Sequence, residues 1–228
     1  MTGYMGYFVI AIVLSIAGMY ISSKLRNKFR KYSQMPIDAG LSGAEVAQRM
    51  LDHYGINDVK IVEGQGFLTD HYNPMSKTVS LSPQVYRGRN IASAAVAAHE
   101  CGHAVQHDTA YSMLQFRSKM VPLVKVASMA QQWLLLAAFL LFGTFPQLML
   151  IVIAAFAVTT IFSFVTLPVE FDASKRALVW LDNTGITSGQ EHKGAKDALW
   201  WAAMTYVSAA LSSLVMLLYL ILRYSAGE

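Results

Sequence analysis

The sequence predicts a mainly α-helical integral membrane protein, with four transmembrane helices and a smaller α+β domain that carries a metal-binding helix. Three observations lead to this fold class. Hydrophobic residues make up 54% of the 228 residues and charged residues only 14%, and the mean hydropathy is +0.38, which is typical of membrane proteins. Four apolar runs are long enough to span a bilayer. Between the first and the second run lies a polar stretch with an H-E-x-x-H motif.

The formal net charge of +4 reflects membrane topology rather than nucleic-acid binding. Lys and Arg are concentrated beside the apolar runs, and they do not form a stripe interleaved with aromatic residues. The single cysteine, Cys101, excludes an intramolecular disulfide, so the fold does not depend on an oxidising compartment. We therefore expect the lipid bilayer as a partner and no nucleic acid.

The first apolar run, residues 4–21, precedes a basic cluster at residues 24–31. A secretory signal peptide carries its positive charges before its apolar core, so the order found here indicates an uncleaved transmembrane anchor over residues 1–23. The positive-inside rule then places the amino terminus outside and residue 24 onward in the cytoplasm.

Residues 24–119 are expected to form a cytoplasmic α+β domain. Ser42 and Glu45 form a capping box before a helix that Gly55 can end. Residues 56–62 and 77–82 alternate well enough for two short strands, whereas residues 70–74, which include a surface histidine, predict a turn. Residues 79–81 are a candidate edge strand for binding an extended substrate backbone, and an ordinary core strand is the alternative.

The chemistry is concentrated in His99-Glu100-Cys101-Gly102-His103, which lies in an Ala-rich segment that favours a helix. Residues four apart share a helix face, so His99 and His103 can direct ring nitrogens at one ion, for which Zn²⁺ is expected. Glu100 is then placed to act as the general base that activates zinc-bound water, as in peptide hydrolysis. Cys101 faces away from this site and is expected to be a packing residue. Chance occurrence of so short a motif is the alternative.

Two further apolar runs, residues 126–145 and 148–167, predict a transmembrane hairpin over residues 120–167. A hairpin returns the chain to the side on which it started, so residues 168–199 are expected in the compartment that holds His99. The last apolar run predicts a transmembrane helix over residues 200–222, which carries the carboxyl terminus outside. Basic residues follow the positive-inside rule in the segment before this helix, namely Lys175, Arg176, Lys193 and Lys196.

A catalytic zinc site needs a third protein ligand. Glu170 is the candidate, because the hairpin returns it to the cytoplasmic side, and Asp172 is its rival. His107 continues the face of His99 and His103, but it lies about 12 Å along the helix from His99, which is too far for one ion.

The H-E-x-x-H motif, followed after a transmembrane hairpin by Glu170-Phe171-Asp172-Ala173-Ser174, resembles the integral-membrane zinc peptidases of the HtpX and CaaX prenyl protease type. In those families the downstream motif is Glu, aromatic, any residue, Ala, Asp, and its Glu is the third zinc ligand. The resemblance gives this role to Glu170. It also places Ser174 where those families have Asp, so that Asp172 is an alternative for the supporting role of that Asp.

The chain is more similar still to the YugP-type neutral zinc metallopeptidases, over essentially its whole length and including the stretch from residue 68 through residue 107. This resemblance implies a gluzincin-like zinc metallopeptidase in the bacterial plasma (inner) membrane. It further implies a multi-pass protein with a cytoplasmic active site that acts on polypeptides, among which misfolded or membrane proteins are candidates.

An oxyanion stabiliser is sought among the remaining polar residues. Tyr206 and Thr205 lie in the last apolar run, and a phenol directed at the zinc would stabilise a tetrahedral intermediate. A tyrosine at the membrane interface is the alternative. His192 and Arg176, both expected in the cytoplasmic loop, are further candidates.

These features predict a membrane-embedded zinc metalloendopeptidase that works at the cytoplasmic face. An intramembrane protease is a second hypothesis, which the polar surroundings of the motif disfavour. A zinc-stabilised scaffold or quality-control adaptor without proteolytic activity is a third. The presence of Glu100 disfavours it, because a purely structural zinc site needs no base.

Overall fold

The computed structural model describes residues 2–141, 144–145 and 147–227. These residues form two compact units that each combine distant parts of the chain. The first unit comprises Met1–Ser22, Phe116–Leu167 and Thr205–Glu228, and the second comprises Ser23–Gln115 and Pro168–Met204.

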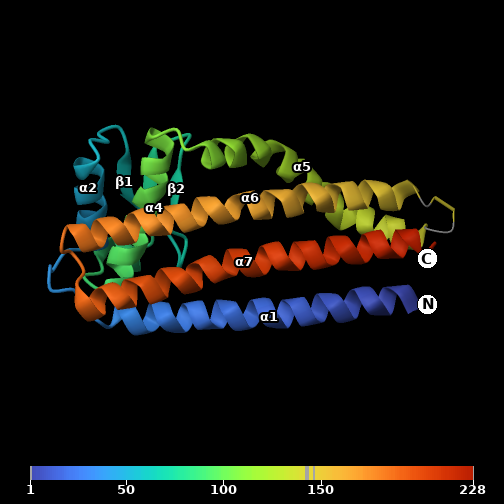
Figure 1. Ribbon diagram of the computed structural model, residues 1–228, viewed down its shortest axis with the longest axis horizontal. Coiled ribbons are helices and arrows are strands. Elements are labelled where there is room, and N and C mark those ends of the chain that lie inside the picture. The colour runs from blue at the N-terminus through green and yellow to red at the C-terminus, as the bar shows by residue number, and fades with distance from the viewer. Residues whose placement is uncertain (1, 142–143, 146, 228) are drawn as a thin grey trace. The chain divides into compact units, whose positions relative to one another are not determined.

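Four long helices, shown in Figure 1, contribute residues to both units. They are α1 (Thr2–Ser33), α5 (Ser112–Leu140), α6 (Gln147–Asn183) and α7 (Gly189–Ser225). In the described part of the chain, three stretches are long and apolar enough to cross a membrane, namely Met5–Ser33, Gln147–Asn183 and Gly189–Ser225. The predicted span over residues 126–145 begins in α5, and residues 142–143 near its end lie outside the described residues.

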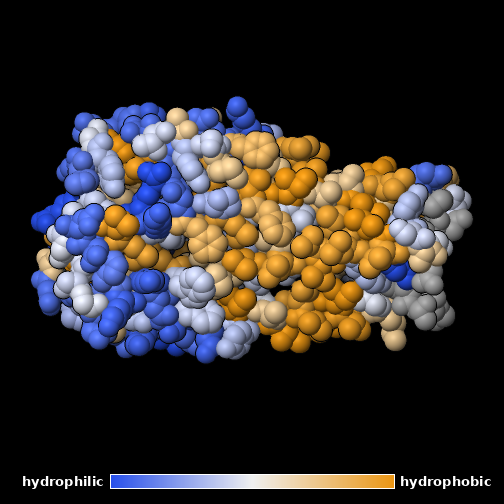
Figure 2. Space-filling view, in the orientation of Figure 1, coloured by the Kyte–Doolittle hydropathy of each residue, from blue (hydrophilic) through white to orange (hydrophobic). Residues whose placement is uncertain are grey.

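The first unit presents apolar side chains to its surroundings. Its small core includes Ala138, Met149, Val152 and Leu220, while many large apolar residues of the same helices are more than half exposed, for example Met129 and Trp133. Figure 2 shows an almost continuous apolar surface over the visible face of this unit. Such a surface is stable in lipid rather than in water.

The segment over residues 168–199, which contains Arg176 and His192, is mostly helical. Helix α6 continues through Pro168 to Asn183, α7 begins at Gly189, and residues 184–188 connect them. The physical reason is an amphipathic pattern after Pro168, in which buried residues recur three or four positions apart, at residues 170, 173, 177 and 181.

The second unit contains a three-stranded sheet made of β1 (Lys60–Glu63), β2 (His71–Asn73) and β3 (Thr78–Leu81). The strand order is β1-β3-β2, with β3 parallel to β1 and antiparallel to β2. Residues 79–81 therefore lie in the central strand, so the candidate edge was wrong and the alternative, an ordinary core strand, holds. The predicted turn at residues 70–74 was also wrong, because residues 71–73 pair with β3 and the turn follows them.

Helices α2 and α4 of this unit begin at side-chain caps. The capping box before α2 (Gly43–His53) is confirmed, since Ser42 Oγ accepts from the Glu45 amide and the Glu45 carboxylate accepts from the Ser42 amide. The short α3 (Pro83–Arg87) precedes the metal-motif helix α4 (Ile91–Asp108). At the start of α4, the Asn90 side chain accepts from the Ser93 amide at 2.9 Å.

Helix α4 lies in the core of the second unit, where most of its residues are buried. Cys101 is fully buried with its Sγ 3.6 Å from the Ala47 carbonyl oxygen. Burial raises the pKa of its thiol. The predicted packing role of Cys101 agrees with this position.

Helices α4 and α6 approach closely at Gly102. A Cβ atom at this position would lie 2.6 Å from the carbonyl oxygen of Ala173, which is closer than van der Waals contact permits. Only glycine lets the two backbones meet here.

We predict that Gly102→Ala destabilises the second unit, because α4 and α6 must separate to admit the new methyl group. Overpacking of this kind costs about 1–3 kcal/mol, which corresponds to a loss of about 2–12 °C in Tm for a chain of this size. The measurement is thermal unfolding of the full chain in detergent with a thiol-reactive fluorogenic dye, since Cys101 is the single cysteine and is buried.

The matched control is Gly18→Ala in α1, where an added Cβ meets no atom within 4 Å. Its Tm should stay at or slightly above that of the parent, because alanine favours a helix. Equal Tm values for both variants would contradict the close approach of α4 and α6.

Candidate metal centre

His99, His103 and Glu170 meet in the second unit. Helix α4 supplies the two histidines one turn apart, and α6 supplies the glutamate. One ligand atom from each side chain lies within 4.8 Å of the other two, and among the described residues no other group of three His, Cys, Asp or Glu meets this condition. Glu170 is 2% and His103 8% exposed.

The separation of these atoms suits a tetrahedral zinc site. Glu170 Oε2 lies 3.3 Å from His99 Nε2 and 3.5 Å from His103 Nε2. Two ligands about 2.0–2.1 Å from a tetrahedral zinc ion are about 3.4 Å apart. Two imidazoles and one carboxylate are also the donor set that a catalytic zinc takes. The residues present therefore fit the ion.

Gln106, one turn beyond His103, fixes the orientation of that imidazole. The Gln106 amide nitrogen donates to the Val169 carbonyl oxygen and to Asp172 Oδ2, each at 2.8 Å. Its amide oxygen must then face His103 Nδ1, at 3.0 Å, and accept a hydrogen bond from the Nδ1–H group. Protonation at Nδ1 leaves the Nε2 lone pair of the neutral ring free for a metal.

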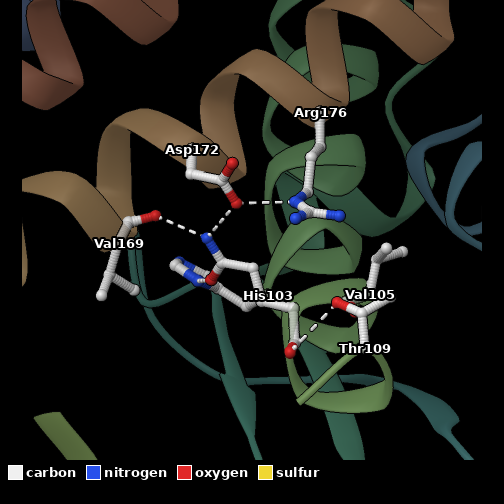
Figure 3. Close-up of polar contacts among 7 residues, drawn as sticks. His103, Val105, Thr109, Val169, Asp172 and Arg176 are labelled. Carbon is white, nitrogen blue, oxygen red and sulfur yellow. Dashed lines mark hydrogen bonds and ion pairs between the residues drawn. The ribbon is translucent and has the colours of Figure 1, made fainter. Parts of the chain in front are cut away.

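Asp172 completes this chain of contacts and is not one of the three clustered ligands. Its Oδ2 accepts from Gln106 and also from Arg176 Nε at 2.6 Å, as Figure 3 shows. Arg176 in turn lies over the Tyr111 ring, 5.9 Å from its centre. Asp172 and Arg176 thus hold Gln106, which holds His103.

Ser174 contacts the other histidine, His99. Its Oγ lies 3.1 Å from His99 Nδ1 and can accept a hydrogen bond from the Nδ1–H group. A hydroxyl group thus occupies the supporting position for which the sequence left Ser174 and Asp172 as alternatives. Each of these two residues supports a different histidine.

Glu100 is 8% exposed. Burial raises the pKa of its carboxyl group, while His99 and His103 oppose this rise. Glu100 directly follows His99 in α4, so its backbone lies next to the cluster. A buried carboxyl group of raised pKa is suited to take up a proton and to return it.

The remaining candidates lie elsewhere. His107 Nδ1 contacts the Tyr72 hydroxyl at 2.8 Å and is not part of the cluster. His71 is exposed, as predicted, and His192 Nδ1 lies 3.3 Å from Thr187 Oγ1. Tyr206 belongs to the first unit, whereas the cluster belongs to the second, so its oxyanion role stays a prediction.

Sequence reasoning missed Gln106. Its spacing offered one signal, since a residue three positions after His103 lies on nearly the same helix face. Its partners Val169 and Asp172 are more than sixty positions away in the chain, and only the fold brings them together.

Comparison with known proteins agrees with this geometry. Residues 7–225 match the family described as "Putative neutral zinc metallopeptidase". The chain is 40% identical, over 221 residues, to "Putative membrane protease YugP" of Bacillus subtilis (strain 168), and the match covers 95% of this chain and 97% of the relative. No solved structure matches the chain. The family match implies Zn²⁺ as the cofactor, in agreement with the donor set, and the chain belongs to the neutral zinc metallopeptidase family.

Proposed function

We propose that the protein is a membrane-embedded zinc metalloendopeptidase that hydrolyses polypeptides at the cytoplasmic face of the bacterial plasma membrane. The observation that carries this proposal is the convergence of His99, His103 and Glu170 beside a buried Glu100. Family membership and the apolar helices support it. A carboxylate as third ligand makes the site gluzincin-like.

The proposed reaction assigns distinct tasks to these residues. His99, His103 and Glu170 would hold zinc, which supplies Lewis acidity for the attack of water on a peptide carbonyl. Glu100 takes a proton from the attacking water and gives it to the leaving amine. Ser174 and Gln106 keep the two imidazoles in position through their Nδ1 atoms.

An extended substrate can pair only with a free sheet edge. In the described part of the chain the two edges are β1 and β2, and β2 contacts α4 as well as β3. We therefore propose β2 in place of β3 as the strand that a substrate backbone joins.

A zinc-stabilised scaffold without proteolytic activity is the competing function. A structural zinc site closes its fourth position with a protein ligand. Among the described residues only three candidate ligands gather, which favours an open position for water and therefore the enzyme.

The ligand set predicts a graded loss of zinc among variants. Glu170→Ala removes a ligand and should abolish stoichiometric zinc. Asp172→Ala removes only support for Gln106 and should lower zinc affinity about 10- to 100-fold. His107 lies outside the cluster, so His107→Ala is the control and should bind zinc like the parent. Metal analysis of purified variants at defined free zinc is the measurement. Equal loss of zinc in the Asp172 and Glu170 variants would show that Glu170 was wrongly assigned as the third ligand.

The role of Glu100 predicts that Glu100→Gln keeps zinc but loses proteolysis by about 10²- to 10⁴-fold, because glutamine cannot accept the proton of water. The measurement is cleavage of an unfolded protein substrate together with zinc content. Glu63→Gln is the matched control, since Glu63 pairs with the exposed Arg87 and is not one of the clustered ligands. Full activity of the Glu100 variant would favour the scaffold.

The proposed orientation predicts which positions face the exterior. In intact cells, an impermeant thiol reagent should label Thr144→Cys, in the proposed external turn, but label Gln190→Cys only after permeabilisation. The buried Cys101 adds little background. Labelling of position 190 from outside would overturn the four-span topology.

A further inference from the structure

An apolar groove lies between α6 and α7 within the second unit, with a volume of about 220 Å³. Phe171 and Val179 line it from α6, and Leu199 and Trp200 line it from α7. Val179 is 49% and Trp200 54% exposed. Exposed apolar residues gathered in one groove indicate a ligand with an apolar part.

Two lysines, Lys175 and Lys196, line the same groove. Both are exposed, and neither forms an ion pair with any residue that the structure describes. The carboxylates nearest in sequence are already engaged, since Asp172 binds Arg176 and Asp197 binds Lys28, each at 2.6 Å. Two positive charges without a counter-ion thus border an apolar groove.

The groove lies close to the predicted membrane surface. The predicted spans end at residue 167 and begin again at residue 200, so Lys196 is about 6 Å and Lys175 about 12 Å beyond them along their helices. Lipid headgroups extend about 5–8 Å beyond the hydrocarbon core, and lysine side chains can reach back toward them. Trp200, at the start of a span, is typical of this interface.

We propose that this groove binds an anionic phospholipid, whose phosphate lies between Lys175 and Lys196 and whose acyl chain packs against Phe171 and Leu199. Basic pockets between membrane helices on the cytoplasmic side suit such headgroups. A zwitterionic lipid would bring a further positive charge to the two lysines, and an apolar protein helix would leave both lysines unpaired. Charge complementarity therefore selects the anionic lipid.

One residue, Ser174, belongs both to the lining of the groove and to the surroundings of the metal centre. Ser174 lines the groove and contacts His99 Nδ1 at 3.1 Å. A bound lipid would thus pack on the turn of α6 that positions a zinc ligand. Binding of the lipid does not depend on proteolytic activity.

The test is native mass spectrometry of the full-length, delipidated protein titrated with phosphatidylglycerol or with phosphatidylcholine of the same chain length. One phosphatidylglycerol should bind saturably, and phosphatidylcholine should bind more weakly. Each lysine beside an anionic lipid contributes about five-fold to affinity, so the double variant Lys175→Gln, Lys196→Gln should bind about 25-fold more weakly. Lys193→Gln, an exposed lysine of α7 outside the groove, is the matched control and should bind normally.

A second variant tests the acyl chain. Val179→Trp fills the groove while both lysines remain, and it should also weaken phosphatidylglycerol binding. Unchanged zinc content in all variants shows that they are folded. Equal binding of the two lipids, full affinity of the double lysine variant or full affinity of Val179→Trp would each overturn the proposal. So would equally tight binding of glycerol phosphate, which lacks an acyl chain.

Discussion

The close contact between Gly102 and Ala173 is the constraint on which the metal centre depends. The H-E-x-x-H helix can offer only two ligands to one ion, so the third must come from another element. Glu170 lies three residues before Ala173 on α6, and the absence of a side chain at Gly102 lets that helix approach α4. Any residue with a Cβ would meet the Ala173 carbonyl oxygen and move Glu170 away from the histidines.

The two histidines are also held at their Nδ1 atoms, by contacts that themselves join α4 and α6. Ser174 contacts the Nδ1 atom of His99, and Gln106 contacts that of His103. Gln106 uses its amide group fully, with one bond accepted and two donated. Because the supports of both histidines depend on α6, the packing that delivers Glu170 also orients the other two ligands. Zinc affinity and the packing of these helices are therefore coupled.

Local patterns in the sequence predicted the starts of helices well, but they did not predict the strand at residues 71–73. The caps at Ser42 and the helix of the motif follow from adjacent residues, and Glu170 follows from the spacing of apolar runs combined with a family resemblance. Long-range order was less accessible. The parallel pairing of β1 with β3, which places residues 79–81 at the centre of the sheet, leaves no trace in strand periodicity. Gln106 was missed for the same reason, because its partners on α6 are distant in sequence.

The most direct test of the central claim is the position of zinc in crystals of the full-length protein, measured by anomalous diffraction at the zinc edge. The account predicts a single strong peak between the Nε2 atoms of His99 and His103 and the carboxylate of Glu170, with no ligand from Asp172. A peak beside His107 and Tyr72, or a peak ligated by the two histidines while Glu170 points elsewhere, would contradict it.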